Sequence, residues 1–115
     1  MRFGRAHRLV VGWQYQRAFR EGKSLRGAHV VAYAHHVPGE PSRLGIIASR
    51  KVGGAVQRNR AKRRLREVAR ALWPRVAQDG RQVVLIALPD VPTVEFERLT
   101  QDVTQLMQQL GVFDR

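Results

Sequence analysis

The chain has 115 residues, 43% of them hydrophobic, with 21 lysines and arginines against 9 aspartates and glutamates, and no cysteine. This length predicts a single domain, residues 1–115, and the lack of cysteine excludes a disulfide framework and a thiolate zinc site. The formal net charge of +12 favours a polyanion as partner. Since no apolar run could cross a bilayer and the N-terminus lacks the apolar stretch of a secretion signal, we expect a cytoplasmic protein.

The positive charge is concentrated in one short segment. Residues 50–70 contain nine basic residues and one acidic residue, whereas residues 71–115 contain four basic and six acidic residues. Charge needed only for solubility would not have to be gathered in this way. We therefore expect the binding surface to include residues 50–70.

The first half of the chain predicts a helix and two strands. Residues 1–8 are basic without a hydrophobic period and predict a flexible arm. Residues 12–21 predict a short helix with Gly22 at its C-terminal cap. Residues 28–37 alternate as a strand does and end at a turn rich in proline and glycine, and the apolar residues 44–49 predict a second strand. A hairpin is the expected pairing of these two strands.

The second half predicts a long helix, a buried strand and a last helix. Pro74 is expected to end or kink the long helix. The apolar face of this helix is predicted to contain Val56, Ala61, Leu65, Val68, Ala69, Leu72 and Val76. Residues 83–88 are uniformly apolar, as in a strand covered on both sides, and residues 92–111 predict a helix closed by a glycine. The order predicts an α+β sandwich with helices on a small sheet.

A cationic ridge is the clearest functional feature of the long helix. Six of the nine residues from Arg58 to Arg66 are basic. Arg58, Lys62 and Arg66 are spaced by four residues, so they stack along a ridge about 12 Å long that could contact successive phosphates. The alternative, a merely solvated helix face, fits less well because the run has a single sign and follows Gly53.

Aromatic side chains predict a second binding feature. Tyr15 and Phe19 are four residues apart and share one face of the first helix, while Tyr33 alternates with His29 and His35 on one strand face. Such surfaces suit unpaired bases, each of which stacks for about 1–3 kcal/mol. The alternative is that these aromatics belong to the core.

The pattern of residues 50–67 is Arg-Lys-Val-Gly-x-Ala-Val-x-Arg-Asn-Arg-x-Lys-Arg-x-x-Arg-Glu. It closely resembles the signature of the protein subunit of bacterial ribonuclease P, and Leu9, Tyr15, Phe19, Gly22 and Tyr33 extend the resemblance over nearly the whole chain. The chain departs from the family pattern where Tyr15 replaces a common Phe. It also departs where Gly54 replaces a polar residue such as Asn, which predicts weaker helix capping.

The resemblance implies a fold, partners and sites. The fold would be a mixed sheet of about four strands with three helices, in the order α-β-β-β-α-β-α, like the second domain of ribosomal protein S5 and with a left-handed crossover. The partners would be the catalytic RNA and precursor tRNA, in a ribonucleoprotein with one copy of each subunit. The residues implied to bind the RNA subunit are Arg50, Lys51, Arg58, Asn59, Arg60, Lys62, Arg63 and Arg66. Those implied to bind the 5′ leader of precursor tRNA are Tyr15, Phe19, Tyr33, Ser49 and Lys51.

Nothing in the sequence predicts bond chemistry by the polypeptide. No histidine has the spacing of a metal ligand, and there is no nucleophile signature. The late carboxylates are expected to be helix-dipole partners and solvated groups: Asp90, Glu95, Glu97 and Asp102. The resemblance implies that Mg²⁺, bound mainly by the RNA subunit, serves the cleavage, and protein-bound metal sites stay undefined.

Three other classes of protein could carry a basic helix: structural RNA-binding proteins, DNA-binding proteins and membrane-surface proteins. Composition alone does not separate a ribonuclease P subunit from a structural RNA-binding protein of the ribosomal type, but the signature and the aromatic residues favour the first. A helix-turn-helix is disfavoured because a strand, not a helix, precedes the basic helix. A membrane-surface helix is disfavoured because the apolar face of the basic helix is needed for the core.

Overall fold

The structure, a computed structural model, describes residues 12–114, with side chains from residue 15 onward. The arm expected at residues 1–8 lies outside these residues. The described elements, in chain order, are α1 (Gly12–Glu21), β1 (Lys23–Arg26), β2 (Val30–His36), β3 (Arg43–Ile47), α2 (Ala55–Leu72), a 3₁₀ turn η2 (Trp73–Arg75), β4 (Arg81–Ala87) and α3 (Phe96–Gln109).

The sheet has four strands in the order β1-β2-β4-β3. β2 is antiparallel to both β1 and β4, and β3 is parallel to β4. The expected hairpin between β2 and β3 is therefore wrong, because the uniformly apolar β4 lies between them. β4 is buried along almost its whole length, which confirms its prediction as a central strand.

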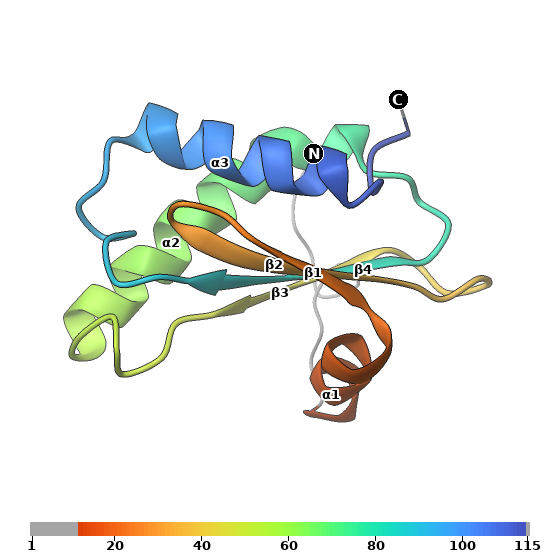
Figure 1. Cartoon of the computed structure of the whole chain (residues 1–115), viewed down its shortest axis with the longest axis horizontal. Coiled ribbons are helices and arrows are strands. Elements are labelled where there is room, and N and C mark those ends of the chain that lie inside the picture. Colours follow the sequence, from red (N-terminus) through yellow and green to blue (C-terminus); the bar gives the residue numbers. More distant parts are fainter. Residues whose placement is uncertain (1–11, 115) are drawn as a thin grey trace.

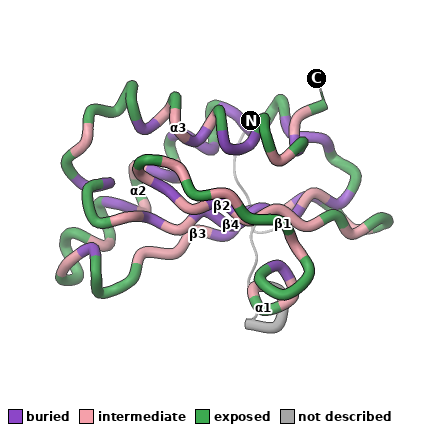
Figure 2. Tube along the Cα trace, viewed as in Figure 1, coloured by how far each residue is buried: buried purple, intermediate pink, exposed green. Residues whose placement is uncertain are grey.

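Helices cover both faces of the sheet (Figure 1). α2 and α3 pack on one face over the main core, which includes Val83, Leu85 and Ala87 of β4. α1 packs on the other face, over Val84 and Ile86 of the same strand. Figure 2 shows the buried residues gathered along the inner sides of α2 and α3 and in the sheet between the helices. The sandwich predicted from the order of elements is confirmed.

Gly22 lies directly after α1, as expected, but for a different reason. Among the described glycines, φ is positive at Gly39, Gly53, Gly80 and Gly111 only. Gly22 is needed because a Cβ there would lie 2.4 Å from the carbonyl oxygen of Ala18 and 2.7 Å from that of Ala34. The missing side chain lets the end of α1 approach β2 closely.

α2 follows its predicted apolar face from Ala61 onward. The buried side chains are Ala61, Leu65, Val68, Ala69 and Leu72. Val56 was wrongly placed on this face, since it is 77% exposed. Five residues separate it from Ala61, which is about 140° around a helix and therefore the wrong spacing for one face. The helix ends at Leu72, and Pro74 lies in the 3₁₀ turn that follows.

α3 begins at Phe96, later than expected, and ends before Gly111, whose φ is +74°. Residues 91–94 form turns instead of helix. The apolar stripe of α3 is buried at Leu99, Val103, Leu106 and Met107. Across residues 12–114, no helix is both long and apolar enough to span a membrane.

Candidate nucleic-acid interface

The sheet face under α1 is arranged in rows set by the strand register. One row runs from Ser24 through Tyr33 and Val84 to Gly45. Ala18 of α1 is fully buried and clusters with Val84. α1 covers this row at Tyr33, Val84 and Gly45, where a small second core forms, whereas Ser24 is exposed.

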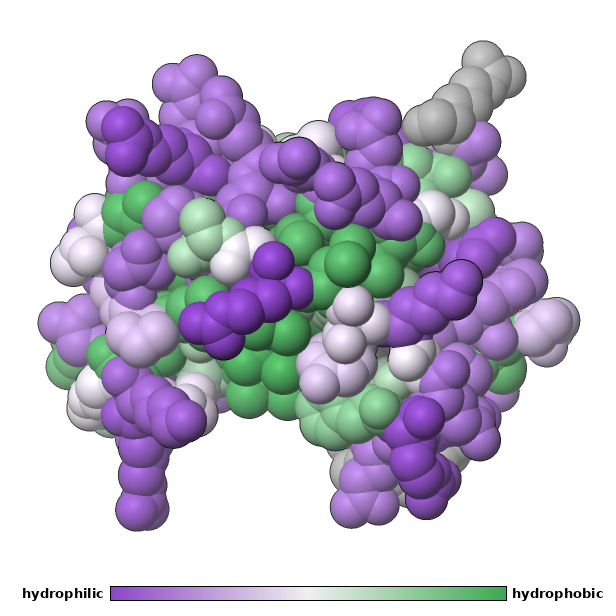
Figure 3. Space-filling model, in the orientation of Figure 1, coloured by the Kyte–Doolittle hydropathy of each residue, from purple (hydrophilic) through white to green (hydrophobic). Residues whose placement is uncertain are grey.

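The next row is only partly covered. It joins Arg26, Val31, Ile86 and Ile47 through the same register. Val31, Ile86 and Ile47 are half-buried, and we call them the apolar strip; Arg26 at its end is exposed. Figure 1 shows α1 beneath only one end of this face. In Figure 3, hydrophobic atoms reach the surface in the middle of the molecule, between hydrophilic side chains on both sides.

Three aromatic rings lie beside the apolar strip, as the sequence predicts. The centroids of Phe19 and Tyr33 are 4.9 Å apart in an edge-to-face arrangement, and those of Tyr15 and Phe19 are 6.5 Å apart. Phe19 is 39% exposed and borders a hollow of about 320 Å³ that Gln16 and Arg20 also line. Tyr15 and Tyr33 pack in part against the small core under α1. These rings are therefore packed on one side and open on the other. The alternative that they belong to the core is correct in part, and base binding stays a prediction.

Tyr15 is fixed by a glycine that the sequence analysis did not single out. A Cβ on Gly45 would lie 2.5 Å from the Cε1 atom of the Tyr15 ring, so the ring lies directly on the backbone of β3. Burial raises the pKa of the Tyr15 hydroxyl. The side chain therefore stays a neutral phenol at physiological pH.

A polar network holds α1 in place. The Arg17 guanidinium is 3.3 Å from the Glu40 carboxylate and donates to the Gln82 side-chain oxygen at 3.2 Å. The Gln82 amide donates to Glu40 at 3.0 Å, and Gln82 is fully buried. These three residues are far apart in the sequence, and no pattern in it brings them together.

Basic residues surround α2 on its solvent side. Of the residues expected to contact RNA, Arg60, Arg63 and Asn59 are exposed, whereas Arg58, Lys62 and Arg66 are half-buried. Each member of the predicted Arg58–Lys62–Arg66 ridge lies two positions, or about 200°, from Arg60 or Arg64. α2 therefore carries cations on two opposite flanks.

One of these flanks faces the loop before α3. The Arg60 Nε donates to the Pro92 carbonyl at 2.9 Å. Arg64 donates to the carbonyls of Val91 and Val94. Desolvation and the nearby Arg60 charge lower the pKa of Arg64. Arg60, expected only to bind RNA, thus also holds the fold, and Arg64 was missed.

Ser49, Arg50 and Lys51 lie between the two surfaces. They are exposed in the turn that follows β3, where the Ser49 hydroxyl accepts the Lys51 N–H at 3.3 Å. The N-cap of α2 is Gly54, and no side chain caps the helix there, as the sequence predicts. This turn joins the end of the apolar strip to the start of α2.

The carboxylates play more specific roles than expected. Asp102 accepts the backbone N–H groups of Ala28 at 3.1 Å and His29 at 2.8 Å. Asp90 pairs with the His29 ring at 2.7 Å. The prediction that Asp90 and Asp102 are only dipole partners and solvated groups is therefore wrong, since both hold the β1–β2 turn.

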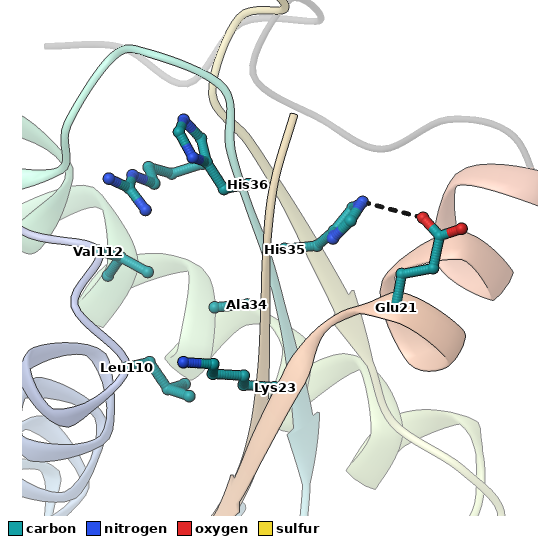
Figure 4. A pocket seen from close by; sticks show the side chains of 8 residues that line it. Glu21, Lys23, Ala34, His35, His36, Leu110 and Val112 are labelled. Carbon is teal, nitrogen blue, oxygen red and sulfur yellow. Dashed lines mark ion pairs between the residues drawn. The ribbon is translucent and has the colours of Figure 1, made fainter. Parts of the chain in front are cut away.

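A cleft of about 360 Å³ opens near the end of α1. Figure 4 shows His35 beside it, reaching the Glu21 carboxylate, with a separation of 3.3 Å. Lys23, Arg81 and Leu110 also line the cleft. No group of three or more His, Asp or Glu side chains that could hold a metal ion occurs among the described residues.

Comparison with known sequences identifies the family. A sequence profile described as Ribonuclease P matches residues 3–111. The chain belongs to the ribonuclease P protein family. The ribonuclease P protein component of Symbiobacterium thermophilum is 42% identical over 112 residues, which cover 96% of each chain. That of Chloroflexus aurantiacus is 38% identical over 105 residues, covering 91% of this chain and 78% of its own.

Solved structures of ribonuclease P proteins share the fold. The protein from Thermotoga maritima matches with a TM-score of 0.77 and 30% identity over 89% of this chain and 96% of its own. The protein from Staphylococcus aureus matches with a TM-score of 0.82 at 24% identity, over 94% of this chain and 98% of its own. The resemblance drawn from residues 50–67 is confirmed, and so is the mixed α+β fold it implies.

Proposed function

We propose that this ribonuclease P protein binds the catalytic RNA subunit and the 5′ leader of precursor tRNA, and so assists removal of the leader to give the mature 5′ end. The observation that carries the proposal is the pairing of two surfaces on one small domain. One surface is aromatic and apolar, on the α1 side of the sheet, and the other is the cationic surface of α2.

The aromatic surface suits the unpaired leader. Phe19 is partly exposed next to Tyr33 and Arg20, so a base can stack on the ring while the guanidinium meets a phosphate. The apolar strip continues this surface toward Ser49 and Lys51. A single strand could therefore run from α1 across the sheet to the turn after β3.

The cationic surface suits structured RNA. Arg58, Lys62 and Arg66 lie along one flank of α2, and Asn59 and Arg63 face outward. Arginine side chains can contact phosphates through two N–H groups at once. The exposed Arg50 and Lys51 extend this surface toward the leader-binding side, which would place the leader next to the RNA subunit.

In this proposal the polypeptide supplies binding rather than bond cleavage. Mg²⁺ held mainly by the RNA would activate the water that attacks the phosphodiester. The cations of α2 would reduce repulsion between the RNA subunit and precursor tRNA. The protein would act as one copy in a cytoplasmic ribonucleoprotein.

Cleavage of precursor tRNA by a bacterial ribonuclease P RNA at low Mg²⁺, with and without the protein, tests the proposal. The protein should restore correct 5′ cleavage. Phe19→Ala should weaken binding of precursor tRNA to the assembled enzyme by about 5- to 100-fold, corresponding to the loss of one stacked base, and should leave binding of mature tRNA unchanged. If the folded protein binds RNA without affecting cleavage, it is a general RNA-binding protein instead.

A further inference from the structure

The flank of α2 that faces α3 carries a hollow in which an exposed apolar side chain lies beside arginines of the proposed RNA-binding surface. It has a volume of about 330 Å³ and is lined by Val56, Arg60, Arg63 and Arg64. Phe96, at the start of α3, lies 5.8 Å from the Arg64 guanidinium. We call Phe96 and these four residues the α2–α3 pocket. Its volume is at the small end of the range for ligand sites, about 300–1,000 Å³.

Exposed apolar side chains mark this pocket. Three large hydrophobic side chains of the described chain are exposed: Phe19, Val56 at 77% and Phe96 at 45%. Phe19 belongs to the proposed leader surface. Val56 lines the hollow, and Phe96 lies beside it, next to the guanidinium of the lining residue Arg64. An exposed Val and Phe beside three arginines are poorly explained by solubility, because either side chain could be polar without loss of core packing.

The arginines of the pocket are held in advance of binding. Arg60 is fixed by the Pro92 carbonyl, and Arg64 by the carbonyls of Val91 and Val94. Holding these side chains in place reduces the entropy that a ligand would have to overcome. Desolvation and, after it, the Arg60 charge lower the pKa of Arg64, and a bound anion would offset the repulsion between these two cations.

We propose that the α2–α3 pocket binds one unstacked nucleotide of an RNA, with its base against Val56 and Phe96 and its phosphate at Arg63. The positive charge around the pocket excludes a cationic ligand and favours a polyanion. Glu95 and Glu97 flank Phe96 in the sequence, so the neutral base is favoured on the Phe96 side and the phosphate on the Arg63 side. The site rests on the proposed function, since the RNA would be the ribonuclease P RNA.

The proposal is tested by binding of the full-length protein to a bacterial ribonuclease P RNA in the absence of tRNA. Phe96→Ala should weaken this binding by about 5- to 100-fold, as expected for one stacked base. The slope of log affinity against log salt should not change, because no charge is removed. Arg63→Gln should instead reduce the slope by about 0.7, the value for one phosphate of a single strand.

Phe19→Ala is the matched control, since it removes the same ring at similar exposure from the other surface. It should weaken binding of precursor tRNA but not of the RNA subunit, and Phe96→Ala should show the reverse. Phe96→Tyr should retain the affinity of the parent protein. Val56→Ser should lower affinity by about 4-fold, the effect of about one buried methyl group, and it should not disturb the core because Val56 is exposed.

The outcomes separate the two proposals. Unchanged affinity in both Phe96→Ala and Val56→Ser would overturn the pocket while leaving the proposed function in place. If the parent protein itself does not bind the ribonuclease P RNA, the proposed function fails first. Should Phe96→Ala melt below the assay temperature, Val56→Ser alone decides: a loss of affinity with an unchanged salt slope supports the pocket, and parent-like binding overturns it.

Discussion

Gly45→Ala should disturb the proposed leader surface through the position of Tyr15. The added Cβ would lie 2.5 Å from Cε1 of Tyr15 and 2.9 Å from Cζ and the hydroxyl oxygen, about 1 Å closer than ordinary contacts allow. Alanine in a strand gains about 0.5–1 kcal/mol over glycine in backbone entropy, whereas overpacking costs about 1–3 kcal/mol. The backbone of β3 is paired with β4 and cannot move away from the ring. We therefore expect the overpacking strain to exceed the gain in backbone entropy, and α1 to shift outward.

Urea unfolding, in buffer with enough sulfate to screen the net positive charge, measures this effect. Gly45→Ala should lower the free energy of unfolding by about 1 kcal/mol, the difference between the middle values of these two contributions. Adding Tyr15→Leu should open the space again, so the double variant should lose less than the sum of the single losses. Precursor-tRNA affinity should fall with Gly45→Ala, while RNA-subunit affinity stays constant. Additivity of the two substitutions within about 0.5 kcal/mol, or parent-like stability of Gly45→Ala, would refute the contact.

Two further predictions concern stability. Burial raises the pKa of Tyr15, so the tyrosine ionises at lower pH in the unfolded chain than in the folded one. The contribution of the neutral phenol to the free energy of unfolding is therefore fully present below about pH 10 and is lost above it. Urea unfolding between pH 7 and 11 should show a smaller alkaline loss for Tyr15→Phe than for the parent protein. Asp102→Ala should cost about 1–3 kcal/mol, because the N–H groups of Ala28 and His29 lose their acceptor. Gln105→Ala, at an exposed position on the same helix, should stay within about 0.5 kcal/mol in the same thermal melts. Equal losses for both variants would contradict a specific role of Asp102.

The sequence predicted those elements whose hydrophobic pattern is unambiguous. α2 repeats its apolar residues at helical spacing from Ala61 to Leu72, and the uniformly apolar β4 could only be a central strand. β1 was not located by residue, because three of its four residues, Lys23–Arg26, are polar and the strand is defined only by its pairing with β2. The hairpin was wrongly predicted for a related reason. Local turn signals do not reveal that β4, more than forty positions after β2, will insert between two earlier strands.

The contacts that shape the two surfaces were beyond sequence analysis. Arg17, Glu40 and Gln82 meet across separations of 23 to 65 residues. Arg60 and Arg64 reach carbonyls 27 to 32 residues away. From the sequence alone, every basic residue in a run of this kind is an equal candidate for a phosphate ligand. Only the fold shows that Arg60 and Arg64 donate hydrogen bonds to the loop before α3. Arg63 is therefore the outward cation of that flank.

The layout of the domain gives a physical reason why the two kinds of RNA contact can be separated by mutation. The proposed leader surface lies on the α1 side of the sheet, and α2 lies on the opposite side (Figure 1). β4 packs against both, with Val83 and Leu85 in one core and Val84 in the other. A change in the interior of β4 therefore affects both surfaces, whereas a change on α1 or on the solvent side of α2 affects one. The turn at residues 49–53 is the short connection between them, so Lys51 is the residue at which leader affinity and RNA-subunit affinity should be lost together.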